Sequence, residues 1–146
     1  MKLTRIELEQ EAIIVSRYCE IISKLMEYAS ELSLIKLYTF AFLYNKTVLN
    51  NWNAYNGGNT KDVVYKCLSL LSGSFKELCQ HMPFIICALD ILCQSKKLIV
   101  CDNYVKYPGI IKKNASLPIL AIIYKALDES KYFTDRQFLK EVMRNV

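Results

Sequence analysis

The amino-acid sequence predicts a single, mainly α-helical domain with one small β-hairpin. The chain has 146 residues, a common length for one domain, and 53% of them are apolar against 23% charged. Apolar residues recur at helical spacing over most of the chain, whereas two short β-prone runs, KLIVC and YVKYP, flank Asp102-Asn103. We expect one domain over 1–146: long helices in 1–50, a helix-turn-helix and hairpin in 60–110, and further helices in 111–146.

The N-terminal part predicts two long helices. From Leu8 to Leu32, apolar residues recur at alternating steps of three and four, broken at Glu11, which predicts a helix over about 5–30 with a broad apolar side. We interpret it as a core helix, and a dimerisation or partner-binding helix is the alternative. Ser33 stands at the N-cap position before the dense apolar run LYTFAFLY, so we expect a second, central helix there.

The middle of the chain predicts a helix, a turn and another helix. A polar loop, TVLNNWNAYNGGNT, comes first, and Gly73 then ends a short helix. Ser74 and Glu77 have the spacing of a capping box. Because proline interrupts a continuous helix but suits a first turn, Pro83 predicts the start of a new helix with the sequence PFIICALDILCQS, which we expect to be buried.

A β-hairpin directly after that helix gives the element order of a winged helix. Asp102-Asn103 forms the expected two-residue turn between the two β-prone runs. Two helices follow, LPILAIIYKALDES and TDRQFLKEVMRNV, the second with Thr134 and Gln137 in capping-box positions. The predicted fold is therefore a winged-helix-like helical domain.

The sequence offers no catalytic, cofactor-binding or metal-binding motif. The one histidine, His81, has no evident carboxylate partner or nucleophile, so we interpret it as a structural residue near a helix end. The six cysteines contain no C-x-x-C pair, so we interpret them as reduced core residues rather than zinc ligands or disulfides. We predict a protein that is not an enzyme.

Length and charge patterns also bear on location. No apolar run approaches the roughly 20 residues of a membrane span. Glu7, Glu9 and Glu11 interrupt the region where a signal peptide would be apolar. We therefore expect a cytoplasmic protein without a membrane partner.

Two sets of residues are candidates for contacts with other molecules. The net charge is +5, with the positive excess toward the C-terminus. Lysines around the predicted hairpin can neutralise DNA phosphates, or they can simply protect an exposed strand edge. These lysines are Lys96, Lys97, Lys106, Lys112 and Lys113. Trp52 in the polar loop, with Tyr104 and Tyr107 in the hairpin, are candidates for partner contacts, because tyrosine and tryptophan serve protein interfaces, although they also serve cores.

A longer pattern points to a family. The succession EQEAIIVSRYCEIISKLMEYASELSLIKLYTFAFLYNK, a polar loop, LSLLSGSF and then MPFIICALDILCQSKKLIV resembles the small middle components of bacterial ABC-three-component systems, which include the accessory subunit of Lamassu-type anti-phage defence. The resemblance spans roughly Leu8 to Tyr107. It consists of a long first helix, a Ser-Leu-x-Lys-Leu helix start at Ser33 to Leu37, and an apolar helix that ends in a short strand.

The resemblance implies a winged-helix-like subunit without catalysis of its own. Such a subunit binds an SMC-like or Rad50-like ATPase and helps couple DNA sensing to a separate effector, often a nuclease. We therefore expect an accessory subunit that bridges an SMC/Rad50-like ATPase and an effector in an anti-phage or anti-plasmid defence complex, with non-specific contact to double-stranded DNA as a further prediction and a homodimer left open. The alternatives are a free-standing winged-helix DNA-binding regulator and a helical-bundle protein-interaction module.

Overall fold

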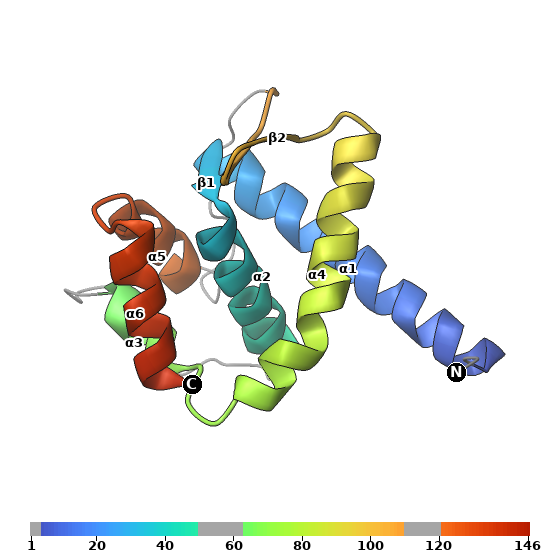
Figure 1. The fold of residues 1–146 in the computed structure, drawn as a ribbon, viewed down its shortest axis with the longest axis horizontal. Helices are drawn as coiled ribbons and strands as arrows, with labels where there is room; N and C mark the ends of the chain where they lie inside the picture. The colour runs from blue at the N-terminus through green and yellow to red at the C-terminus, as the bar shows by residue number, and fades with distance from the viewer. Residues whose placement is uncertain (1–3, 50–62, 110–120) are drawn as a thin grey trace.

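A computed structural model describes residues 4–49, 63–109 and 121–146 of the chain (Figure 1). The elements, in order, are α1 (Arg5–Ala29), β1 (Glu31–Ser33), α2 (Leu34–Leu49), α3 (Val63–Ser69), α4 (Phe75–Gln94), β2 (Ile99–Cys101), β3 (Tyr104–Lys106), α5 (Ala121–Ser130) and α6 (Asp135–Asn145). The prediction of a mainly α-helical fold with a small β-hairpin is confirmed. None of the helices in these ranges is long and apolar enough to cross a lipid bilayer.

Helix α1 begins and ends where its local chemistry dictates. Thr4 and Glu7 form a capping box, in which each side chain accepts a hydrogen bond from the other residue's backbone N–H. The helix ends because Ser30 adopts a positive φ of 64°. Its buried residues begin at Tyr18, so only the C-terminal half belongs to the core. The N-terminal half projects from the body of the molecule (Figure 1).

The three strands form one antiparallel sheet in the order β1-β3-β2. Val105 lies between Leu32 on one side and Val100 on the other, and Asp102 makes the predicted hairpin turn with a φ of 55°. Strand β1 was not predicted: Ser33, expected as an N-cap, is instead buried at the end of this strand, and its Oγ has no hydrogen-bond partner. The first backbone N–H of α2, that of Leu34, donates instead to the carbonyl of Asn103 at 2.8 Å.

Helix α4 contradicts the prediction that Pro83 starts a new helix. The helix runs unbroken from Phe75 to Gln94 with Pro83 inside it, and the ribbon curves along its length (Figure 1). Proline removes the N–H that would donate to the carbonyl of Cys79, but both residues are exposed, so water can satisfy that carbonyl. The predicted capping box is also wrong, because the Ser74 side chain makes no capping bond and instead accepts a hydrogen bond from Lys46.

The order α1, β1, α2, α4, β2, β3, with β1 paired to β3, is that of a winged helix, and α3 is an additional short helix before α4. Helix α2 lies in the middle of the molecule (Figure 1). It packs against α1 and α4 on one side and against α5 and α6 on the other. Phe40 of α2 is fully buried, with its ring centroid 5.5 Å from that of Phe138 in α6. The described residues thus share one hydrophobic core.

Candidate docking surface

The outer face of α4 is exposed and apolar. The helix buries Ile85, Ala88, Leu89 and Leu92 against the core. On its two flanks, Ile86 remains 48% exposed toward β2 and Ile91 45% exposed toward α1, so the expectation that this whole helix is buried was wrong. Apolar residues are so dense in this segment that they lie on more than one side of the helix. The sequence alone does not show which of these sides packs against the core and which stays exposed.

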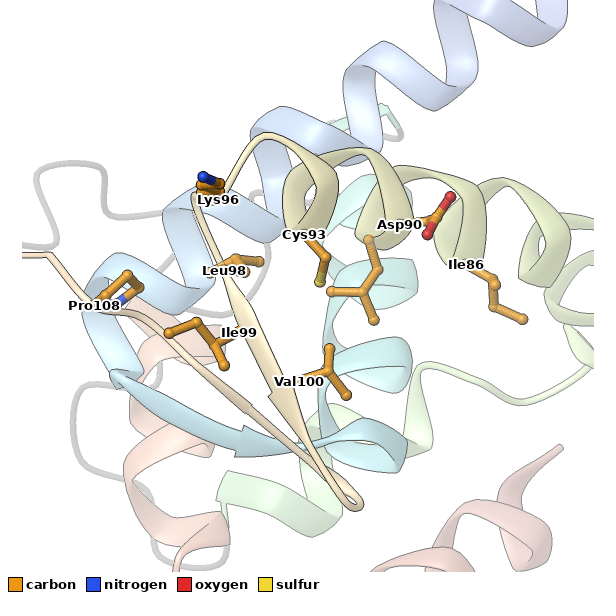
Figure 2. A pocket seen from close by; sticks show the side chains of 9 residues that line it. Ile86, Asp90, Cys93, Lys96, Leu98, Ile99, Val100 and Pro108 are labelled. Atoms are coloured by element: carbon orange, nitrogen blue, oxygen red, sulfur yellow. The ribbon is translucent and has the colours of Figure 1, made fainter.

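A groove of about 770 Å³ lies between α4 and strand β2, and we call it the α4–β2 groove (Figure 2). The residues that line it are Ile86, Leu89, Asp90 and Cys93 of α4, Lys96, Leu98, Ile99 and Val100 at β2, and Pro108. All three residues of β2 are exposed, and β2 is one of the two edge strands of the sheet. An edge strand presents backbone N–H and C=O groups that another chain can pair with.

A second groove, of about 710 Å³, lies on the other side of α4, and we call it the α1–α4 groove. Its lining comes from α1 (Leu8, Glu11, Ala12, Val15, Ser16 and Cys19) and from α4 (Pro83, Phe84, Cys87 and Ile91). Leu8 is 53% exposed, because it belongs to the projecting half of α1. The outer face of α4 is therefore flanked by apolar grooves on both sides.

The predicted hairpin lysines lie partly beside this surface. Lys96, Lys97 and Lys106 are exposed, and Lys96 lines the α4–β2 groove. Lys96 and Lys97 also line a smaller hollow together with Glu27, so a carboxylate lies in the same hollow as their positive charges. Two further predicted lysines, Lys112 and Lys113, lie outside the described residues.

The three aromatic residues predicted to contact a partner differ in their surroundings. Tyr104 in β3 is 45% exposed. Tyr107 is half-buried: its backbone N–H donates to the Ser30 carbonyl at 2.8 Å, and its ring packs so closely on Gly109 that a Cβ there would lie 2.6 Å from the ring. Tyr107 thus closes the end of the sheet. Trp52 lies outside the described residues.

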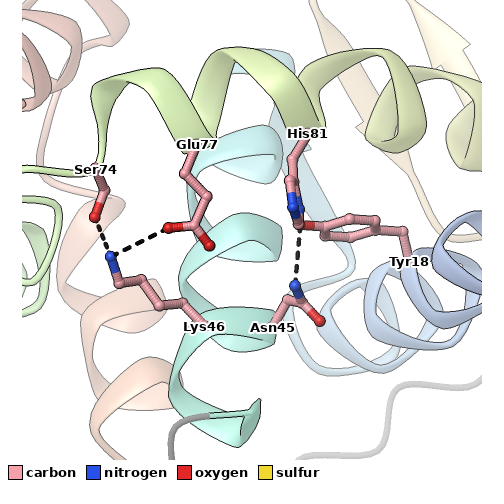
Figure 3. A network of polar contacts seen from close by, with 6 residues as sticks. All are labelled: Tyr18, Asn45, Lys46, Ser74, Glu77 and His81. Atoms are coloured by element: carbon pink, nitrogen blue, oxygen red, sulfur yellow. Dashed lines mark hydrogen bonds and ion pairs between the residues drawn. The ribbon is translucent and has the colours of Figure 1, made fainter.

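A polar network behind α4 holds the helix in position (Figure 3). The buried Tyr18 hydroxyl lies 2.5 Å from His81 Nδ1 and accepts a hydrogen bond from Asn45 Nδ2 at 3.3 Å. Burial raises the pKa of Tyr18 and lowers the pKa of His81. Because the Tyr18 hydroxyl accepts from Asn45, its own proton can be donated to His81 Nδ1 when that nitrogen carries none. We had expected His81 near a helix end. Because α4 is continuous, His81 instead lies within the helix.

The same network anchors the beginning of α4. Lys46 Nζ donates to Ser74 Oγ and lies 3.7 Å from Glu77 Oε2. Lys46, at the end of α2, therefore provides the fixed contact that the predicted Ser74-Glu77 capping box would have supplied. These contacts give α4 a defined position against α1 and α2, and so set the walls of both grooves.

A buried lysine joins α2 to the C-terminal helices. Lys36, part of the Ser-Leu-x-Lys-Leu pattern, donates to the carbonyls of Ser130 at 2.8 Å and Phe133 at 2.7 Å. Burial lowers the pKa of this ammonium group. A cation at the end of α5 also complements the partial negative charge of a helix C-terminus. The role of Lys36 is to hold the turn between α5 and α6 on the core.

The cysteines differ from the expectation that they are core residues. Cys67 is fully buried, which raises its pKa to about 12, but Cys79, Cys87 and Cys101 are exposed. All six are free thiols. Within the described ranges, no group of three or more histidine, cysteine or acidic residues has an arrangement that could hold a metal ion.

The fold and this surface define a class: a winged-helix-like domain whose outer helix is flanked by two apolar grooves. Comparisons with protein-family models, curated proteins and solved structures find no match to the chain. The particular family implied by the sequence pattern therefore stays a prediction.

Proposed function

We propose that this chain is a non-enzymatic winged-helix-like subunit that binds a partner protein through the α4–β2 groove. The observation that carries the proposal is the composition of the outer face of α4. In a DNA-reading winged helix the corresponding helix enters the major groove and needs hydrogen-bond donors for the base edges. Here the exposed side of α4 offers Ile86, Cys87 and Ile91, with the carboxylate of Asp90, which repels phosphate. The Gln94 amide on the same side donates to this carboxylate at 2.9 Å, so its donor is already engaged.

The partner follows from the resemblance of the sequence to middle components of ABC-three-component systems. We propose an SMC/Rad50-like ATPase, which this subunit bridges to an effector of an anti-phage or anti-plasmid defence complex. A bridging subunit needs more than one contact surface, and grooves on both sides of α4 support that role. The exposed edge of β2 suits a partner segment that adds a strand, with apolar side chains of the segment in the groove.

The test is affinity purification of the tagged chain from its host, with mass spectrometry and a nucleotide-hydrolysis assay on the proteins that come down. The variant Ile86→Asp with Val100→Asp places two charges in the α4–β2 groove and should lose a large coiled-coil ATPase. Tyr132→Asp is the matched control, because Tyr132 is 88% exposed and outside the groove. Recovery of the ATPase with the groove variant would refute this docking site, and recovery of no ATPase with the unaltered chain would refute the partner.

A second candidate function, direct contact with DNA, is favoured by the exposure of Lys96, Lys97 and Lys106 at the hairpin. These lysines would bind phosphates without reading sequence. Replacing them, together with Lys112 and Lys113, by glutamine should flatten the salt dependence of binding to duplex DNA. An unchanged slope would remove DNA from this surface, and strong preference for a palindromic operator would favour a free-standing regulator instead.

A further inference from the structure

Two cysteines line the α1–α4 groove, and they come from its two walls. On α1, Cys19 follows the lining residues Val15 and Ser16 at helical spacing, so the three share one face of the helix. On α4, Cys87 follows Phe84 by three residues and shares a helix face with it in the same way. Both cysteines are free thiols. The groove therefore has a thiol on each of its walls.

The sulfur of Cys19 lies against the backbone of α4. Its S–H donates to the carbonyl of Ala88 at 3.7 Å, and Ala88 is the residue next to Cys87. The side chain of Ala88 is a single buried methyl group, which allows α1 to come close to α4 at this point. The hydrogen bond between Tyr18 and His81 joins the same two helices, one residue before Cys19. The two cysteines are thus held where α1 and α4 are in contact.

The two thiols differ in their exposure. Cys87 is exposed and Cys19 is half-buried, so an oxidant in solution reaches Cys87 more readily. Burial raises the pKa of Cys19 and the neighbouring Cys87 raises it further, whereas Lys97 lowers it. One sulfur can change the pKa of the other in this way only when the two are near each other. Cys19 is therefore a protonated thiol near neutral pH, close to a more accessible one.

We infer that Cys19 and Cys87 form a redox-active thiol pair, which hydrogen peroxide converts into a disulfide between α1 and α4. In the first step the Cys87 sulfur attacks one peroxide oxygen and the O–O bond breaks. Cys87 becomes a sulfenic acid, and the other oxygen leaves as water with the thiol proton.

The second step closes the bond between the helices. The Cys19 sulfur attacks the Cys87 sulfur, the S–S bond forms and the S–O bond of the sulfenic acid breaks. The hydroxyl group leaves with the proton of Cys19 as a second molecule of water. In total two thiols are oxidised to one disulfide, and one hydrogen peroxide is reduced to two waters.

The disulfide would connect the two walls of the α1–α4 groove at the Cys19 end. A partner segment that lies between the walls there would then be excluded, so occupancy of this groove would depend on oxidation. In a reducing compartment the pair stays as two thiols, and disulfides that form there are mostly transient and redox-sensing. Neither cysteine lines the α4–β2 groove, so this inference does not depend on the function proposed above.

The test is treatment of the purified, reduced full chain with hydrogen peroxide, followed by mass spectrometry without reduction. The unaltered protein should remain a single chain and lose the mass of two hydrogen atoms. A tryptic digest should contain the peptide 18–24 linked to the peptide 77–96, and fragmentation should place the link at Cys87 rather than at Cys79 or Cys93. The cross-link closes a long loop, so it should raise Tm by about 5–10 °C.

Three serine variants separate this pair from general thiol oxidation. Cys87→Ser and Cys19→Ser should each abolish the linked peptides and the rise in Tm. Cys79→Ser is the matched control, because Cys79 is an exposed thiol of the same helix outside the groove, and it should form the link like the unaltered chain. Circular dichroism verifies that every variant is folded. A link between other cysteines, a Cys19 thiol that stays free after Cys87 is oxidised, or two thiols that resist peroxide would each overturn the inference.

Discussion

Removal of the Tyr18 hydroxyl should destabilise the protein although the ring remains. In Tyr18→Phe the ring still packs edge-on against His81, with the centroids 5.7 Å apart in the unaltered protein, so no cavity forms. The buried Asn45 amide loses its acceptor, and its Oδ1 already lacks a hydrogen-bond partner. Leaving buried polar groups unpaired costs about 1–3 kcal/mol. For a chain of this size we expect Tm to fall by about 2–4 °C per kcal/mol.

The measurement is urea denaturation followed by circular dichroism, with the free energy of unfolding taken from the midpoint and slope. Tyr132→Phe, at an exposed tyrosine, is the control and should stay within about 0.5 kcal/mol of the unaltered protein. The double variant Tyr18→Phe with Asn45→Leu should lose less than the sum of the two single changes, because it removes both partners of one bond. A neutral or stabilising Tyr18→Phe would refute the view that this network holds α4 in place.

Three further outcomes follow from described contacts. Ser33→Ala should leave the free energy of unfolding unchanged or raise it, because Ser33 Oγ is buried without a partner; loss of a true N-cap would instead cost about 1 kcal/mol in the same urea titration. Lys36→Met should lower Tm, because two carbonyls of the α5–α6 turn lose their donor, and tryptic cleavage after Lys131 should become faster. Burial lowers the pKa of His81 below its value of about 6.5 in the unfolded chain, so the unfolded chain binds this proton more readily than the folded one. The free energy of unfolding should therefore fall as the pH drops from above about 6.5 through the pKa of the folded state. In denaturation experiments between about pH 7.5 and 5, His81→Phe should lack this part of the pH dependence.

Local patterns predicted the elements whose signals are local. The capping box formed by Thr134 and Gln137 and the hairpin turn at Asp102-Asn103 are present as expected, because each depends on neighbours within a few residues. Strand β1 was missed because three residues between two helices form a strand only when β3 lies beside them. Pro83 misled the prediction because a proline on an exposed helix face costs one hydrogen bond that water can replace.

The candidate site was less predictable than the fold. The hairpin lysines and tyrosines stand out by residue type, but Ile86, Ile91, Ile99 and Val100 read as core residues, and their exposure emerges only when the packing of α4 is known. The hydrogen-bond partner of His81 could not be predicted from the sequence either, because Tyr18 lies 63 positions away along the chain. Hydrophobic spacing indicates that a helix has an apolar face, but it does not tell how many elements are present to cover that face.

The pairing of Leu32 with Val105 has a consequence for how the protein is made. The sheet joins the segment after the first helix to the second strand of the hairpin, so it cannot close until the chain from α2 through β3 has left the ribosome. Contacts between residues so distant in sequence form late, because the intervening loop must be ordered first. Strands β2 and β3 and the groove beside them come from residues 86–108, so they do not depend on that distant contact. The pairing of β1 with β3 is instead the contact that forms only when the first helix and the hairpin have come together.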